Sequence, residues 1–140
     1  MKKNTVNTFR KMKAEGNKIV MITSYDAVTA AMAHAAGADL LLVGDSMANA
    51  ILGYPNTIAL SFEESMFHVQ AVRRGAPDAF VIADMPFMTF QNSMEKALDN
   101  AAAYLQKCGA DAVKIEGGLQ ILPVMQRMVE CGIPVMAHIG

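Results

Sequence analysis

Leu40-Leu41-Leu42-Val43-Gly44-Asp45-Ser46 is an apolar run that ends abruptly in polar residues. Four further runs of this kind occur along the chain, and segments with helical character separate them. Buried apolar runs with polar residues at their carboxyl ends are typical of parallel strands. Their alternation with helices predicts an α/β fold with a parallel sheet and right-handed crossovers. The expected strands cover residues 19–24, 40–44, 80–84, 112–116 and 134–138.

Capping residues mark the starts of the expected helices. Ser61-Phe62-Glu63-Glu64 has the Ser-x-x-Glu form of a capping box. Asp26 and Ser93 are N-cap residues for two further helices. Arg73 and Arg74 stand at a helix end, where cations complement the helix dipole. The expected helices cover residues 5–15, 27–36, 62–74 and 94–107.

The chain of 140 residues has the length of one domain, spanning residues 1–140. Five strands and four crossover helices make just over half of a (β/α)8 TIM barrel, which usually needs about 250 residues. The sheet is therefore either open and completed by oligomerisation, or the first part of a longer barrel. The segment from Ser46 to Leu60 is either an active-site lid or a short packed hairpin.

The composition is that of an ordinary soluble globular protein, with 53% hydrophobic residues, 18% charged residues and a net charge of −1. No basic stripe is present, so nucleic acid is not an expected partner. No apolar stretch approaches the roughly 20 residues that span a bilayer, so a membrane is not expected either. Cys108 and Cys131 are interpreted as small buried apolar groups in a reducing compartment, which indicates the cytoplasm.

Acidic residues stand at the carboxyl ends of three of the expected strands, or directly after them. Because the carboxyl ends of parallel strands share one rim, we expect Asp45, Asp84, Glu116 and the strand residue Lys114 to converge. Carboxylate oxygens suit Mg²⁺, and a lysine beside the ion could neutralise an anionic substrate. The alternative is that each acid caps the helix after its strand.

The three histidines carry weaker signals. His138 ends the last strand and is either a substrate contact or a packed side chain. His34 and His68 lie within expected helices and are interpreted as structural or solvent-facing.

Five blocks of sequence together carry a resemblance. They are Ile22–Asp26, Leu42–Ser46, Ala71–Pro77, Ala83–Met88 and Val113–Gly118. In this order they closely resemble the ketopantoate hydroxymethyltransferase family of pantothenate biosynthesis. The resemblance implies a (β/α)8 barrel of the phosphoenolpyruvate/pyruvate-binding kind, about twice the length of this chain. It also implies hydroxymethyl transfer from 5,10-methylenetetrahydrofolate to 2-oxoisovalerate through an enolate that Mg²⁺ stabilises.

The resemblance also implies roles for individual residues. Asp45, Asp84 and Glu116 correspond to the Mg²⁺ ligands, whereas Asp45, Ser46, Asp84 and Lys114 would contact the small-molecule 2-oxo acid, with His138 a possible further contact. No acid in the chain matches the family's proton-acceptor glutamate, so no catalytic base is assigned and the isolated chain is expected to be inactive. A homo-oligomer is expected. The alternatives are a non-catalytic half-barrel that binds ligand or assembles, and another Mg²⁺-dependent lyase of the same superfamily.

Overall fold

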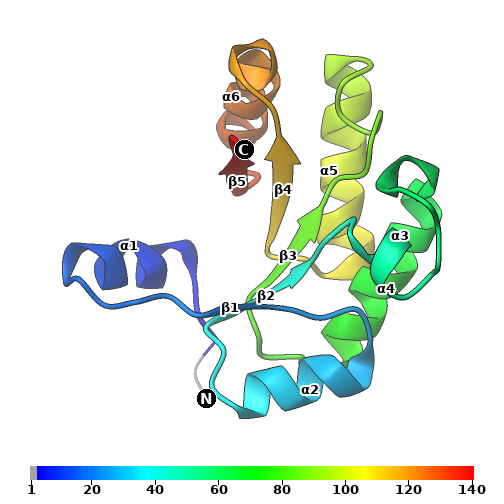
Figure 1. Ribbon diagram of the computed structural model, residues 1–140. Coiled ribbons are helices and arrows are strands. Elements are labelled where there is room, and N and C mark those ends of the chain that lie inside the picture. Colours follow the sequence, from blue (N-terminus) through cyan, green and yellow to red (C-terminus); the bar gives the residue numbers. More distant parts are fainter. Residues whose placement is uncertain (1–2) are drawn as a thin grey trace.

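The computed structural model describes residues 3–140 and contains a five-stranded sheet in the order β1-β2-β3-β4-β5 (Figure 1). Every neighbouring pair of strands is parallel, as the alternating apolar runs predict. The α/β fold expected from the sequence is therefore confirmed. The strands are β1 (Met21–Thr23), β2 (Leu40–Val43), β3 (Val81–Asp84), β4 (Ala112–Glu116) and β5 (Val135–His138).

A helix leads the sheet, and further helices connect its strands. The capping box at Ser61 forms as expected, and Asp26 and Ser93 each accept backbone N–H groups of the helix that follows. The long helices are α1 (Val6–Ala14), α2 (Ala27–Ala35), α4 (Phe62–Gly75), α5 (Met94–Cys108) and α6 (Leu122–Glu130). Shorter turns are α3 (Met47–Ala50), η1 (Thr57–Ala59) and η2 (Leu119–Ile121).

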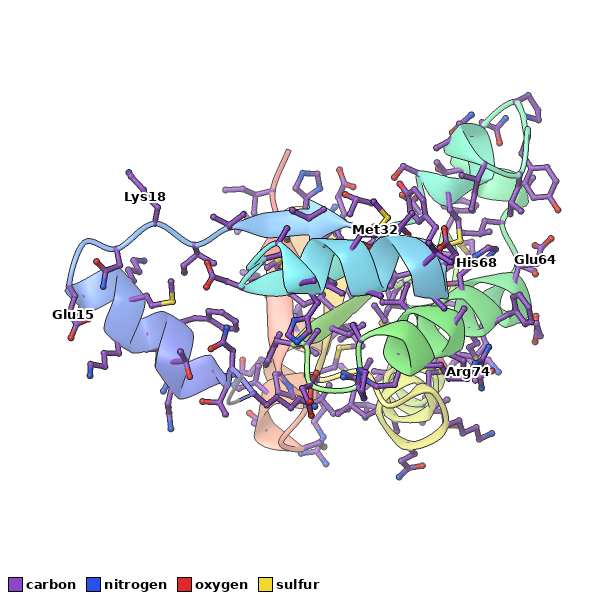
Figure 2. The ribbon with its side chains drawn as sticks, turned by 90° about the horizontal axis from the view of Figure 1, so that it is seen from below. Glu15, Lys18, Met32, Glu64, His68 and Arg74 are labelled. Carbon is purple, nitrogen blue, oxygen red and sulfur yellow. The ribbon has the colours of Figure 1, made fainter. Side chains whose placement is uncertain are left out.

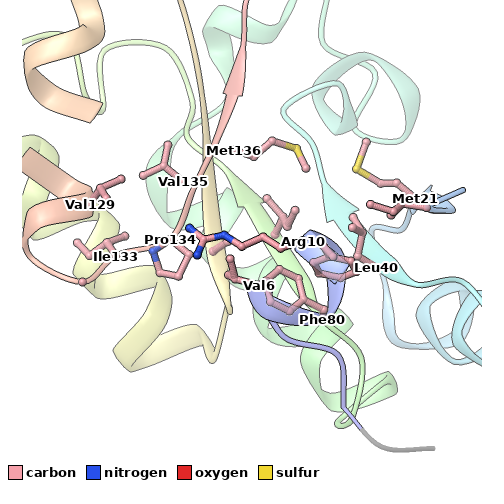
Figure 3. Close-up of a pocket in the computed structure, with 15 residues that line it drawn as sticks. Val6, Arg10, Met21, Leu40, Phe80, Val129, Ile133, Pro134, Val135 and Met136 are labelled. Carbon is pink, nitrogen blue, oxygen red and sulfur yellow. The ribbon is translucent and has the colours of Figure 1, made fainter. Parts of the chain in front are cut away.

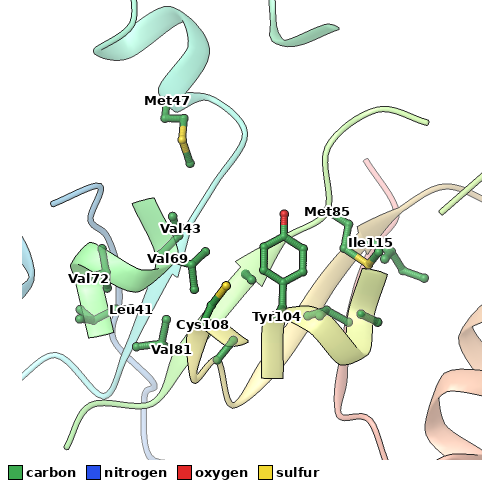
Figure 4. Packing of buried hydrophobic residues seen from close by; sticks show 14 of the residues in the cluster. Leu41, Val43, Met47, Val69, Val72, Val81, Met85, Tyr104, Cys108 and Ile115 are labelled. Carbon is green, nitrogen blue, oxygen red and sulfur yellow. The ribbon is translucent and has the colours of Figure 1, made fainter. Parts of the chain in front are cut away.

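The sheet buries its two faces against different partners. Residues paired in a parallel sheet share a face, and Leu41, Val81 and Val113 belong to the large core beneath the connecting helices (Figure 4). On the opposite face, Phe80 and its neighbours form a smaller cluster that α1 covers. There the ring of Phe9 meets the ring of Phe80 edge to face, with their centroids 4.9 Å apart.

The face of the sheet that α1 covers is apolar at one end of the strands and polar at the other. Near the amino ends of the strands, this face lines an apolar cavity of about 620 Å³ between α1, the sheet and the turn before β5 (Figure 3). Side chains two residues apart on a strand point to the same face of the sheet. Toward the carboxyl ends of β3 and β4, the residues that continue this face are polar. Asp84 follows Ile82 in this manner, and Lys114 follows Ala112. The fold therefore places Asp84 and Lys114 next to the apolar side chains of the same sheet face.

The first strand is shorter and more exposed than the sequence predicts. Only Met21–Thr23 form β1, and all three residues are exposed, because β1 pairs on one side with β2 alone. The chain before it is held by Asp39, whose Oδ2 accepts the N–H of Val20 at 2.8 Å. A strand therefore forms within residues 19–24 as expected, but the expectation that it is buried along its length was wrong.

Two smaller expectations also need correction. The segment after Ser46 forms the helical turns α3 and η1 rather than a hairpin, and Met47 is fully buried. Cys108 is buried as expected, but Cys131 is exposed, because it lies in the turn after α6.

Candidate functional site

Asp84 is the most buried of the charged residues at the carboxyl rim. It ends β3, its side chain is 7% exposed, and its Oδ1 lies 2.8 Å from Lys114 Nζ on β4. Burial raises the pKa of Asp84, while the hydrogen bond and positive charge of Lys114 oppose that rise and the negative charge of Asp45 adds to it. Ser93 caps the next helix, so Asp84 is free of that role. The sequence predicted that these residues converge, and the register of β3 and β4 places Asp84 directly beside Lys114.

The loop after β2 brings Asp45 and Ser46 to the same place. The backbone N–H of Asp45 donates to Asp84 Oδ2 at 3.3 Å. Gly44 is buried beside them, and a Cβ on it would meet Ser46 Oγ at 3.2 Å and Asp84 Oδ2 at 3.8 Å. The missing side chain of Gly44 therefore leaves a small space onto which the serine hydroxyl and the aspartate carboxylate both open.

Glu116 and His138 form a separate pair. They are register partners on β4 and β5, and Glu116 Oε2 lies 3.0 Å from His138 Nδ1. Both side chains are about half exposed, at 60% and 47%, so His138 is not a packed core histidine. Among residues 3–140, no three His, Cys, Asp or Glu side chains are grouped closely enough to hold a metal ion by themselves. The structure thus gathers Asp45, Asp84 and Lys114 but does not add Glu116, and the three-carboxylate ligand set stays a prediction.

The charges at Asp84 suit a divalent cation. Two carboxylates, Asp45 and Asp84, are opposed by the single ammonium of Lys114, which leaves one negative charge in excess. Mg²⁺ typically takes one or two protein carboxylates and completes its shell with water and substrate oxygens. The donor set present is therefore suited to Mg²⁺ without a third protein carboxylate.

Sequence reasoning did not assign Tyr25 or His68 to the site, although both are connected to Ser46 by hydrogen bonds. Tyr25 Oη lies 2.8 Å from Ser46 Oγ, and the main-chain oxygen of Tyr25 accepts from His68 Nδ1 at 2.7 Å. His68 lies on α4, one turn after Glu64 (Figure 2). The position of Tyr25 directly after the first strand was an available signal, because strand ends of this fold carry the functional residues.

Solved structures with a similar arrangement of strands and helices identify the fold of the chain. It is similar to 2,3-dimethylmalate lyase, described as a member of the PEP mutase/isocitrate lyase superfamily, with a TM-score of 0.66, 18% identity, and coverage of 94% of this chain and 51% of that chain. Oxaloacetate acetylhydrolase in complex with oxalate gives a TM-score of 0.66 at 14% identity, covering 91% of this chain and 50% of that chain. The chain therefore shares the fold of these proteins over the part that carries its five parallel strands.

Sequence comparison identifies the family. The model of the family described as ketopantoate hydroxymethyltransferase matches residues 3–140, and the chain belongs to this family. It is 58% identical over 135 residues to 3-methyl-2-oxobutanoate hydroxymethyltransferase of Thermotoga neapolitana, covering 96% of this chain and 49% of that protein. The enzyme of the same name from Carboxydothermus hydrogenoformans is 49% identical over 140 residues, covering 100% of this chain and 51% of that protein. The chain thus spans about half the length of the curated relatives it matches.

Proposed function

We propose that these residues supply the metal and 2-oxo acid binding part of a 3-methyl-2-oxobutanoate hydroxymethyltransferase. The observation that carries the proposal is the buried ion pair of Asp84 and Lys114 beside Asp45, in a chain of this family. The reaction removes the C3 proton of 2-oxoisovalerate, and C3 then bonds to the methylene carbon of 5,10-methylenetetrahydrofolate. Water supplies the hydroxyl group, and tetrahydrofolate leaves with ketopantoate as the other product.

Asp45 and Asp84 would hold the metal ion, and Glu116 is the third ligand proposed. A bound Mg²⁺ would polarise the keto and carboxylate oxygens and make the C3 proton more acidic. One similar solved structure, a phosphonopyruvate hydrolase with a TM-score of 0.66 and 20% identity, is described as a complex with oxalate and Mg²⁺. That description supports Mg²⁺ as the metal ion proposed here.

The side chains around the acids would bind the oxo acid. The side chain of Lys114 is 12% exposed and forms an ion pair with Asp84. Its ammonium group would also neutralise the substrate carboxylate. Ser46 would donate its hydroxyl to a substrate oxygen from the other side of Gly44. None of these groups is a suitable base, because the carboxylates are committed to the cation and Lys114 is a donor.

Calorimetry tests the binding half of this proposal. The chain should bind Mg²⁺ weakly, and more tightly once 2-oxoisovalerate is present, because the oxo acid completes the coordination shell. Asp84→Asn should abolish this response. Asp78→Asn, which removes an exposed carboxylate from the turn before β3, is the matched control and should retain it. An unchanged response in Asp84→Asn would remove Asp84 from the site.

Proton exchange tests the catalytic half. In deuterated water the 140-residue chain should exchange the C3 proton of 2-oxoisovalerate very slowly and form no ketopantoate, because loss of a positioned base costs about 10² to 10⁴ in rate. Rapid ketopantoate formation would show that a base lies within the chain. His138 would then be the first residue to substitute.

We also propose that the chain self-associates and resides in the cytoplasm. β1 and β5 each pair on one side only within the described sheet. Apolar residues are exposed in β1 and directly before it, among them Ile19, Val20 and Met21. Light scattering at micromolar concentration should therefore give a mass above 15.0 kDa. A stable mass at that value would contradict self-association.

For residues 3–140, no helix has the length and apolar character to cross a membrane.

A further inference from the structure

A tyrosine outside the expected ligand set is hydrogen-bonded to the site. Tyr25 lies in the turn between β1 and α2, is half-buried, and packs against the main core. Its Oη is 2.8 Å from Ser46 Oγ, a contact between two loops that are 21 residues apart in sequence. This hydroxyl pair stands beside the space that Gly44 leaves open next to Asp84.

The main chain of Tyr25 is itself held in place. A carbonyl oxygen can only accept, so His68 Nδ1 carries the proton in its 2.7 Å hydrogen bond to Tyr25 O. On the other side of Tyr25, the Asp26 carboxylate accepts the N–H groups of Val28 and Thr29 at 2.8 Å. The tyrosine is thus anchored by α4 and by the cap of α2, which leaves its ring in a defined place.

The Tyr25–Ser46 contact allows either hydroxyl to donate, and a 2-oxo acid bound to Ser46 would fix the direction. A serine hydroxyl has one proton to donate and can accept in return. Keto and carboxylate oxygens only accept, so Ser46 must give its proton to the oxo acid. The proton between the two hydroxyls must then come from Tyr25.

We propose that Tyr25 is a positioning residue that donates to Ser46 Oγ and thereby aims the serine proton at the 2-oxo acid. The inference rests on the proposed function, because it needs Ser46 to contact that ligand. Without the tyrosine proton, the Ser46 hydroxyl can rotate and loses both its orientation and the polarisation that a donor confers. Tyr25 itself need not touch the ligand or the metal.

A double-substitution cycle on the affinity for 2-oxoisovalerate in saturating Mg²⁺ tests this role. Tyr25→Phe should weaken binding about fivefold to tenfold, the value of one neutral hydrogen bond. In a Ser46→Ala background the same change should matter less than about twofold, because no serine proton is left to aim. Affinity for Mg²⁺ alone should stay the same in every variant. Tyr54→Phe is the matched control, because its hydroxyl donates to Glu64 instead, and it should bind as the unsubstituted chain does.

The outcomes separate the two proposals. If the unsubstituted chain binds 2-oxoisovalerate and Tyr25→Phe binds it equally well, the positioning role is wrong and the proposed function stands. An equal loss in the Ser46→Ala background would also overturn it, since Tyr25 would then act independently of the serine. If the unsubstituted chain shows no binding at all, the proposed function fails and takes this inference with it. Thermal unfolding of each variant shows whether a loss reflects the fold.

Discussion

Replacing Arg73 by methionine should be among the most damaging single changes to the stability of this chain. Arg73 Nε donates to the carbonyl oxygen of Gly109 at 2.8 Å, and its Nη1 donates to those of Pro77 and Ala79 at 2.9 and 2.8 Å. Its Nη2 pairs with Asp111, which also accepts the backbone N–H of Val81. One guanidinium thus joins the end of α4 to the turns before β3 and β4.

The expected cost follows from this burial. Removing one partner of a buried ion pair costs about 3–5 kcal/mol. Arg73 and Asp111 are 17% and 18% exposed, and Lys3 Nζ lies 2.6 Å from the same carboxylate, so Asp111 would keep one cation. We therefore expect the lower end, about 3 kcal/mol, which corresponds to a fall in melting temperature of about 10 °C for this size of domain.

Urea unfolding followed by circular dichroism measures this difference. Methionine keeps most of the aliphatic stem, so the loss reports the guanidinium. Arg74→Met is the matched control, because Arg74 is its exposed neighbour in the same last turn of α4 and contributes the same helix-dipole term. If Arg73→Met unfolds within about 0.5 kcal/mol of Arg74→Met, a difference usual for surface changes, the bracing role assigned to Arg73 is wrong.

Two further predictions concern the packing and capping of α4. Gly75→Ala should destabilise the chain by about 3 kcal/mol, because its Cβ would lie 2.1 Å from the carbonyl oxygen of Ala27 on α2; a urea midpoint equal to that of the unsubstituted chain would contradict this close approach. Hydrogen bonds from Ser61 and Tyr54 lower the pKa of Glu64 to about 2. A lowered pKa gives stability that is complete above the ordinary value of about 4.3 and fades as the pH falls toward the folded-state value. The melting temperature of the unsubstituted chain should therefore exceed that of Glu64→Gln at neutral pH, and the difference should shrink as the pH is lowered. A difference in melting temperature that does not change with pH would show that ionised Glu64 does not stabilise the fold.

Local chemistry made much of the fold predictable. The caps Asp26, Ser61 and Ser93 act within one helical turn, so their sequence pattern is enough to place the starts of α2, α4 and α5. Where pairing across the sheet decides the outcome, the sequence was a weaker guide. β1 has the apolar composition of a buried strand, but its exposure depends on how many neighbours it has.

The amino-acid sequence by itself determined the order of strands and helices, the rim position of Asp45, Asp84 and Lys114, and the family. These follow from periodicity, capping and motif, which are all properties of neighbouring residues. Only the tertiary structure decided the partners: Lys114 for Asp84, His138 for Glu116, and Tyr25 for Ser46. Such contacts join segments far apart in the chain, and their distances depend on register, twist and loop path. The sequence therefore identifies candidate ligands, and the contacts between neighbouring strands and loops decide which of them lie together.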